Sequence, residues 1–124
     1  MNSTGDVGCH RVAVYGTLKR GCSNHPLLVR SRFLGTDWLR HIVLYDLGPC
    51  PGARKARSSG VLVEIYEVDD PTMARLDELE GYNASAPERG EYTRERMTTR
   101  FGDAWVYLYN GSVRGCRRMA QGSW

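Results

Sequence analysis

The chain has 124 residues, of which 41% are apolar and 25% charged, and its 17 basic and 14 acidic residues give a formal net charge of +3. This length fits one domain, residues 1–124, that buries about two thirds of the surface of the unfolded chain. No apolar run can cross a bilayer and the N-terminal residues do not form a secretory signal, so we expect a cytoplasmic protein without membrane contact.

The segment 11–28 joins an apolar run to a polar loop flanked by glycines. Residues 12–15 are typical of a strand, and Gly16 permits a turn that a side chain would hinder. Residues 17–21 then place several unpaired amide groups in a small volume, which can hold an anion without a side-chain cation. An ordinary tight connection explains the same pattern, and on the loop alone it is the favoured explanation.

The next predicted element is a short helix that begins at Asn24 and Pro26 and ends by Gly35. Its buried stripe would consist of Leu27, Leu28 and Phe33.

Residues 38–47 predict one strand, which ends at the rigid turn 48–52. The segment 53–59 is polar without periodicity and predicts an exposed loop.

Residues 61–68 carry the strongest strand signal, with alternating apolar side chains on a buried face. Glu64 lies on the more polar face and is predicted to face solvent. A helix of about ten residues follows, with Asp70 as its cap, Pro71 in the first position and Gly81 just past its end.

The C-terminal third predicts a loop at 83–90, then strands at 92–99 and 104–109 joined by a turn. The whole pattern predicts an α+β fold: a small, mixed, barrel-like β core with a few short flanking helices. Residues 1–10 and about 112–124 are expected to be irregular tails.

Glu80 lies on the face of the predicted helix that should be buried. Steps of 100° per residue place it in one arc with Met73, Leu76 and Leu79. Burial and the C-terminal end of the helix dipole both raise the pKa of a carboxyl group there. A general acid or base working near neutral pH needs such a pKa.

Two alternatives remain open for this helix. Glu80 is equally explained as a partly exposed helix end beside Gly81. Asp77 flanks the same face and is the competing carboxylate, unless it only bonds loop backbone or pairs with a neighbouring arginine.

The cysteines and histidines form no metal-ligand pattern, because neither occurs at paired ligand spacings. We therefore predict no metal site. The residues concerned are Cys9, Cys22, Cys50, Cys116, His10, His25 and His41.

Basic residues cluster at 54–57 and 114–118, which favours solvated surface over a nucleic-acid interface. The predicted strands lack the aromatic-glycine pattern of an RNA-recognition sheet. We expect no nucleic-acid partner, and an RNA- or DNA-binding module is the weakest alternative.

Several segments together resemble the γ-glutamylcyclotransferase-like family, which includes γ-glutamylamine cyclotransferase and the BtrG and AIG2-like enzymes. The resemblance covers most of the chain and is strongest at 12–21 and 76–82. Each segment is weak alone, but their order and separations are specific. The supporting residues are Asn24, His25, Gly48, Pro51, Gly52, the segment 60–69, Tyr92 and Arg94.

The resemblance implies an acyltransferase-type enzyme that releases a γ-glutamyl group as 5-oxoproline. The substrate's α-amine would attack its own γ-carbonyl, with Glu80 as the general acid/base. Amide groups of Gly16, Thr17 and Leu18 would hold the α-carboxylate, and Tyr15 would pack against the glutamyl moiety. No cofactor is implied.

The segment 83–92 departs from the family, because it is longer and more polar than the compact turn of γ-glutamylamine enzymes. It is expected to border the pocket mouth, which puts the leaving group in doubt. Tyr92 is predicted to bind substrate or to pack within its strand, packing is favoured for Arg94, and the role of Tyr82 is open.

The function expected from the sequence is therefore turnover of a small γ-glutamyl amine or peptide by a monomer or weak dimer. The alternative is a non-catalytic relative that binds an acidic metabolite or a protein partner in the same pocket.

Overall fold

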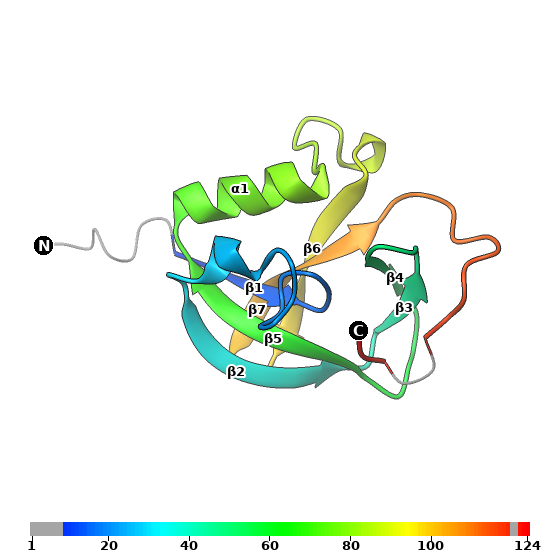
Figure 1. The fold of residues 1–124 in the computed structure, drawn as a ribbon, viewed down its shortest axis with the longest axis horizontal. Coiled ribbons are helices and arrows are strands. Elements are labelled where there is room, and N and C mark those ends of the chain that lie inside the picture. The colour runs from blue at the N-terminus through cyan, green and yellow to red at the C-terminus, as the bar shows by residue number, and fades with distance from the viewer. Residues whose placement is uncertain (1–8, 120–121) are drawn as a thin grey trace, which may run out of the picture.

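The computed structural model describes residues 9–119 and 122–124, and its centre is a twisted five-stranded sheet (Figure 1). Strands β1 and β7 are parallel, and the other neighbours are antiparallel. In pairing order, the strands are β2 (Arg32–Leu39), β5 (Val61–Val68), β1 (His10–Val14), β7 (Gly102–Tyr109) and β6 (Tyr92–Thr99).

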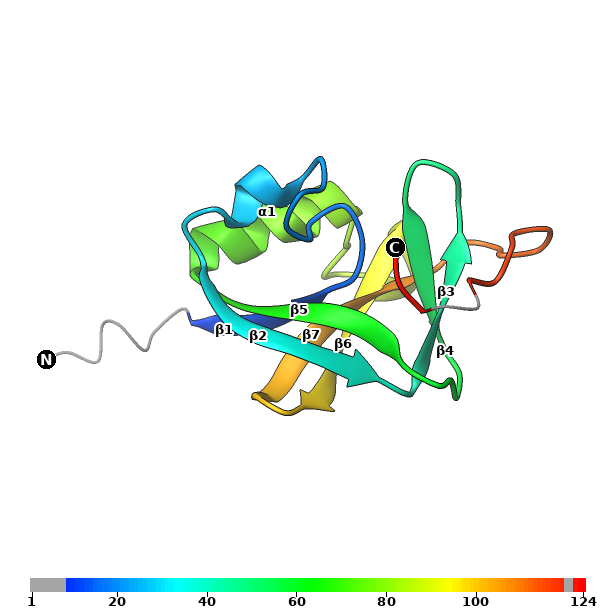
Figure 2. The same ribbon diagram turned by 60° about the horizontal axis from the view of Figure 1, so that its bottom comes forward.

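The remaining elements are one hairpin and three short helical segments. Figure 2 shows the hairpin at one end of the sheet, with α1 over one face. They are β3 (Ile42–Asp46), β4 (Pro51–Lys55), the α-helix α1 (Asp70–Glu80), and the 3₁₀ turns η2 (His25–Leu28) and η3 (Pro87–Arg89).

The predicted α+β class is confirmed, but the sheet does not close into a barrel. Its two edge strands, β2 and β6, do not pair with each other in the described chain. No helix in that part of the chain has the length and apolarity needed to cross a bilayer.

The sheet is buried on both faces because apolar residues occupy successive positions of its central strands. Along β1, Val12 and Val14 pack toward α1 beside Met73 and Leu76. Ala13 points to the other side, toward the β3–β4 hairpin. The period of two in a strand therefore divides the core into two layers.

The helix α1 follows the predicted signals closely. Asp69, one residue before the expected cap, accepts a hydrogen bond from the backbone N–H of Thr72 at 2.9 Å. The helix ends at Gly81, whose left-handed φ of 67° suits glycine. These ends place Glu80 in the last turn, at the edge of the sheet.

Two predictions between residues 24 and 47 were wrong. The expected helix is only the turn η2, and Phe33 is an exposed residue of β2. The expected strand 38–47 is divided between β2 and β3. Antiparallel pairing of β2 with β5 determines both outcomes, and this contact between distant residues overrides local propensity.

The segment 53–59 was also predicted wrongly, because its first three residues belong to β4. Ala53 is fully buried opposite Leu44 of β3. The hairpin contact supplies the apolar surface that the polar sequence does not reveal.

The C-terminal tail has no helix or strand among its described residues, 111–119 and 122–124, apart from one bridge to Tyr45. It is nevertheless fastened to β3 and β5. Met119 donates to the carbonyl of Leu44 at 2.9 Å, and Leu62 donates to that of Gly122 at 2.8 Å. Of the expected N-terminal tail, residues 1–8 lie outside the described residues and His10 begins β1.

Candidate active site

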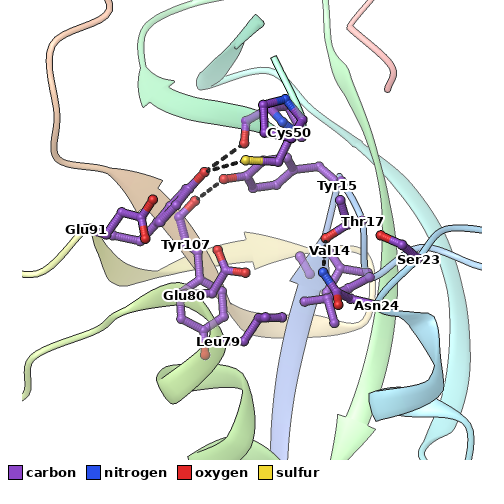
Figure 3. Close-up of a pocket in the computed structure, with 16 residues that line it drawn as sticks. Val14, Tyr15, Thr17, Ser23, Asn24, Cys50, Leu79, Glu80, Glu91 and Tyr107 are labelled. Atoms are coloured by element: carbon purple, nitrogen blue, oxygen red, sulfur yellow. Dashed lines mark hydrogen bonds between the residues drawn. The ribbon is translucent and has the colours of Figure 1, made fainter. Parts of the chain in front are cut away.

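A cavity of about 300 Å³ opens between the loop after β1 and the end of α1 (Figure 3). The β3–β4 turn and the strands β6 and β7 complete its wall. All six predicted site residues line this one cavity: Tyr15, Gly16, Thr17, Leu18, Glu80 and Tyr92.

The loop after β1 contributes backbone amide groups to the cavity wall. No acceptor is present for the N–H groups of residues 16–18 within the described chain. The carbonyl groups of the same three residues, in contrast, all accept hydrogen bonds inside the loop. The C=O and N–H groups of a trans peptide point in opposite directions, so the N–H groups of Thr17 and Leu18 point away from these donors. The donors to the carbonyls of Gly16, Thr17 and Leu18 are Lys19 N at 3.0 Å, Asn24 N at 2.8 Å and His25 Nδ1 at 2.9 Å.

Gly16 is needed for close packing rather than for an unusual backbone angle. Its φ is not positive, but a Cβ atom there would lie 2.9 Å from the ring of Pro51. Real Cβ atoms do not approach so closely, so glycine lets the loop lie directly against the β3–β4 turn.

The same loop is anchored to the sheet and to the tail. Glu64 accepts hydrogen bonds from Arg20 N and from the hydroxyl of Tyr66, both at 2.9 Å, and its side chain is only 13% exposed. The prediction that Glu64 faces solvent was therefore wrong. The buried Lys19 donates from Nζ to the carbonyl of Trp124 at 2.8 Å.

Glu80 points its carboxylate into the cavity (Figure 3). The carboxylate has no hydrogen bond or ion pair with any described residue. Burial, and secondarily the negative charge of Glu91, raise the pKa of Glu80 to about 7. The group therefore takes up and releases a proton near neutral pH.

Two tyrosines of the cavity wall use their hydroxyl protons to hold the backbone together. Tyr15 donates to the carbonyl of Tyr107 at 2.7 Å and accepts from Ala53 N at 3.3 Å. Tyr92 donates to the carbonyl of Pro51 at 2.9 Å. Burial raises the pKa of both phenols, so they stay neutral and offer ring surface rather than a proton.

Asp77, the competing carboxylate, does not line the cavity. It accepts a hydrogen bond from the Tyr107 hydroxyl at 2.7 Å and pairs with Arg94 Nε at 3.3 Å. The Arg94 guanidinium also lies 4.7 Å from the ring centre of Tyr82 and 4.3 Å from that of Trp105. The packing predicted for Arg94 and the arginine pair considered for Asp77 are confirmed.

Other lining residues were missed from the sequence, notably Cys50 and Tyr107. Cys50 lies in the predicted rigid turn, with Sγ 3.7 Å from the Tyr92 hydroxyl. Of the segment 83–92, which was expected to border the pocket mouth, Glu91 and Tyr92 line the cavity and residues 83–90 do not. No local pattern marks Glu91, because its place depends on how the chain returns to α1.

The cavity thus combines free amides, a carboxylate that titrates near neutrality and aromatic surface. No lysine, arginine or histidine lines it among the described residues. In the same part of the chain, no three His, Cys, Asp or Glu side chains gather as metal ligands would. The groups present suit an anionic substrate end and a proton transfer.

Comparison with known proteins identifies the family. A family model described as "Gamma-glutamyl cyclotransferase, AIG2-like" matches residues 12–124. A Vibrio cholerae protein is 40% identical over 116 residues, covering 93% of this chain and 95% of that protein. The gamma-glutamylcyclotransferase family protein YtfP of Escherichia coli is 33% identical over 114 residues, covering 92% and 95%. A crystal structure from Pyrococcus horikoshii matches with a TM-score of 0.75 and 33% identity over 92% of this chain and 88% of that one. The chain therefore belongs to the gamma-glutamyl cyclotransferase, AIG2-like family.

Proposed function

We propose that the protein releases 5-oxoproline from a small γ-glutamyl amine or peptide. One observation carries this proposal: the Glu80 carboxylate, with its pKa of about 7, lines the same cavity as the amides of residues 16–18, and none of these groups has a partner among the described residues. A γ-glutamyl group offers a carboxylate for the amides and an amine for Glu80. Family membership supports the reaction class.

Substrate binding would use the loop and the aromatic wall. The α-carboxylate accepts hydrogen bonds from the N–H groups of Thr17 and Leu18, and the methylene chain lies against the rings of Tyr15 and Tyr92. This bends the γ-carbonyl toward the α-amine. Both reacting groups belong to one molecule, so correct folding of the chain supplies much of the rate enhancement.

Proton transfer would use Glu80 alone. The ionised carboxylate takes a proton from the α-amine as its nitrogen attacks the γ-carbonyl and closes the lactam. The bond from the γ-carbon to the leaving nitrogen then breaks, and Glu80 returns the proton to the leaving amine. A pKa of about 7 allows both transfers, and the enzyme ends in its starting state.

The direct test is a screen of γ-glutamyl amines and peptides for release of 5-oxoproline. We expect 5-oxoproline and the free amine to appear in equal amounts from at least one member of the panel. If γ-glutamyl compounds only raise the melting temperature, without turnover, the alternative of a non-catalytic binding protein is correct. That alternative is motivated by the unusual segment 83–92.

Removing the anchor of the loop should weaken substrate binding. Lys19→Met keeps the buried aliphatic stem but loses the hydrogen bond to Trp124. Since the bond holds the residue next to the amides, we expect KM to rise about 3- to 10-fold with little change in kcat, matching about 1 kcal/mol for one hydrogen bond. Steady-state kinetics measure this.

The matched control for this prediction is Lys55→Met. Lys55 pairs with the exposed Glu95 and does not line the cavity. The KM of the Lys55→Met variant should therefore equal that of the wild type. An unchanged KM in Lys19→Met would show that the tail contact does not organise the loop.

A further inference from the structure

Glu91 places a second carboxylate at the mouth of the cavity. The residue is exposed and lines the cavity, and its carboxylate has no hydrogen bond or ion pair within the described chain. Its backbone is fixed on both sides: its N–H donates to Gly81 at 3.0 Å, and its carbonyl accepts from Asn110 at 3.0 Å. These two bonds hold the backbone of Glu91, and so the base of its side chain, at the cavity mouth.

The position of Glu91 is beside the end of α1. A Cβ atom on Gly81 would lie 3.1 Å from Cβ and 3.6 Å from Oε1 of Glu91. Glu80 and Glu91 line the same cavity, so an amine that Glu80 protonates leaves through a space that Glu91 also borders.

The charged side chains that line the cavity are all acidic among the described residues. Glu80 and Glu91 are the charged side chains in its wall, and no basic side chain of the described residues balances them. The nearby Arg94 is already held by Asp77 and two aromatic rings. A negative wall attracts a cationic group and repels a carboxylate at the same place.

The rim also offers apolar surface. Leu79 lines the cavity and is 38% exposed, next to Glu80 in sequence. An aliphatic stem can cover this side chain while its end reaches Glu91. The wall thus suits a leaving group with a short apolar stem and a cationic end.

We propose that Glu91 determines specificity by selecting γ-glutamyl conjugates whose leaving amine carries a second, cationic group. Conjugates that carry a carboxylate at that end are disfavoured. This inference rests on the proposed function, and it goes further by assigning a role to a residue outside the acid/base and loop machinery.

Three conjugates of similar length test the inference: γ-glutamyl derivatives of a diaminobutane, a pentylamine and an aminobutanoate. The wild type should show the highest kcat/KM for the cationic conjugate and the lowest for the anionic one. In Glu91→Gln, the ratio of cationic to anionic kcat/KM should fall about 3- to 20-fold, as expected for two partly solvated charge contacts.

The neutral conjugate separates selectivity from catalysis. Any effect of Glu91→Gln on the proton transfer of Glu80 changes all three rates, whereas selectivity changes only their ratios. Glu88→Gln is the matched control, because Glu88 is exposed and does not line the cavity. Its ratios should equal those of the wild type.

Two results would overturn the inference in distinguishable ways. If the wild type turns over all three conjugates and Glu91→Gln leaves their ratios unchanged, Glu91 does not set specificity while the proposed function stands. If the wild type releases no 5-oxoproline from these conjugates or from the wider panel, the proposed function fails, and the inference fails with it.

Discussion

Replacing Glu80 with glutamine lowers the rate of 5-oxoproline release at least about 100-fold, the lower end of what a positioned acid/base contributes. Glutamine keeps the size and shape of the side chain but cannot accept the proton of the α-amine. The amides of residues 16–18 are untouched, so binding of the γ-glutamyl group should persist. Rates measured with the best conjugate of the panel, together with product binding by calorimetry, give both quantities.

Glu78→Gln is the control for this loss. Glu78 is on the same helix, two residues earlier, but it is exposed and does not line the cavity. Its variant should keep wild-type activity. A fully active Glu80→Gln protein would remove the proposed mechanism, whatever the substrate.

The same substitution should stabilise the protein at neutral and alkaline pH. The pKa of Glu80 is about 7 in the folded state against a reference value of 4.5. Between these values the folded protein keeps a proton that the unfolded chain has lost, so stability decreases as pH rises through this window. The difference of about 2.5 pKa units corresponds to at most about 3 kcal/mol.

Glutamine resembles the protonated carboxyl group and does not titrate. The melting temperatures of Glu80→Gln and wild type should therefore be similar below pH 4.5 and diverge in favour of the variant up to about pH 8. Other titrating groups are common to both proteins and cancel in the difference. If the difference in melting temperature between the two proteins stays constant over the whole pH range, burial does not raise the pKa of Glu80 in the folded protein.

Predictions from local signals succeeded where the signals are strong. The helix α1 has an acidic cap, a proline at its start and a glycine at its end, and the structure moves the cap by only one residue. Its period of 3.6 placed Glu80 on the inner face, where the cavity lies. Alternation likewise identified β5, and two strand-like runs joined by a turn identified the β6–β7 hairpin.

The failures concern contacts between distant segments. Phe33 lies in a strand because β2 pairs with β5, and Ala53 is buried because β4 pairs with β3. Neither partner is visible in the local sequence. The local sequence also could not show that the sheet stays open, because closure into a barrel depends on whether the edge strands β2 and β6 pair with each other.

In the candidate site, too, some residues have local sequence signals and others are brought in only by contacts between distant segments. The loop at 16–18 and Glu80 have local signatures, whereas Glu91 reaches the cavity through its backbone bonds to Gly81 and Asn110. The helix pattern alone also left Asp77 open as the carboxylate that competes with Glu80. Only the fold shows that Asp77 is occupied by Tyr107 and Arg94.

A crystal structure of the protein with 5-oxoproline bound tests whether the loop amides and Glu80 bind one ligand together. We predict that the ligand carboxylate lies within about 3.2 Å of the N–H groups of Thr17 and Leu18, and that its ring nitrogen lies at a similar distance from a Glu80 oxygen. A ligand whose carboxylate binds elsewhere, or whose ring nitrogen faces away from Glu80, would rule out the roles proposed for the loop amides and for Glu80.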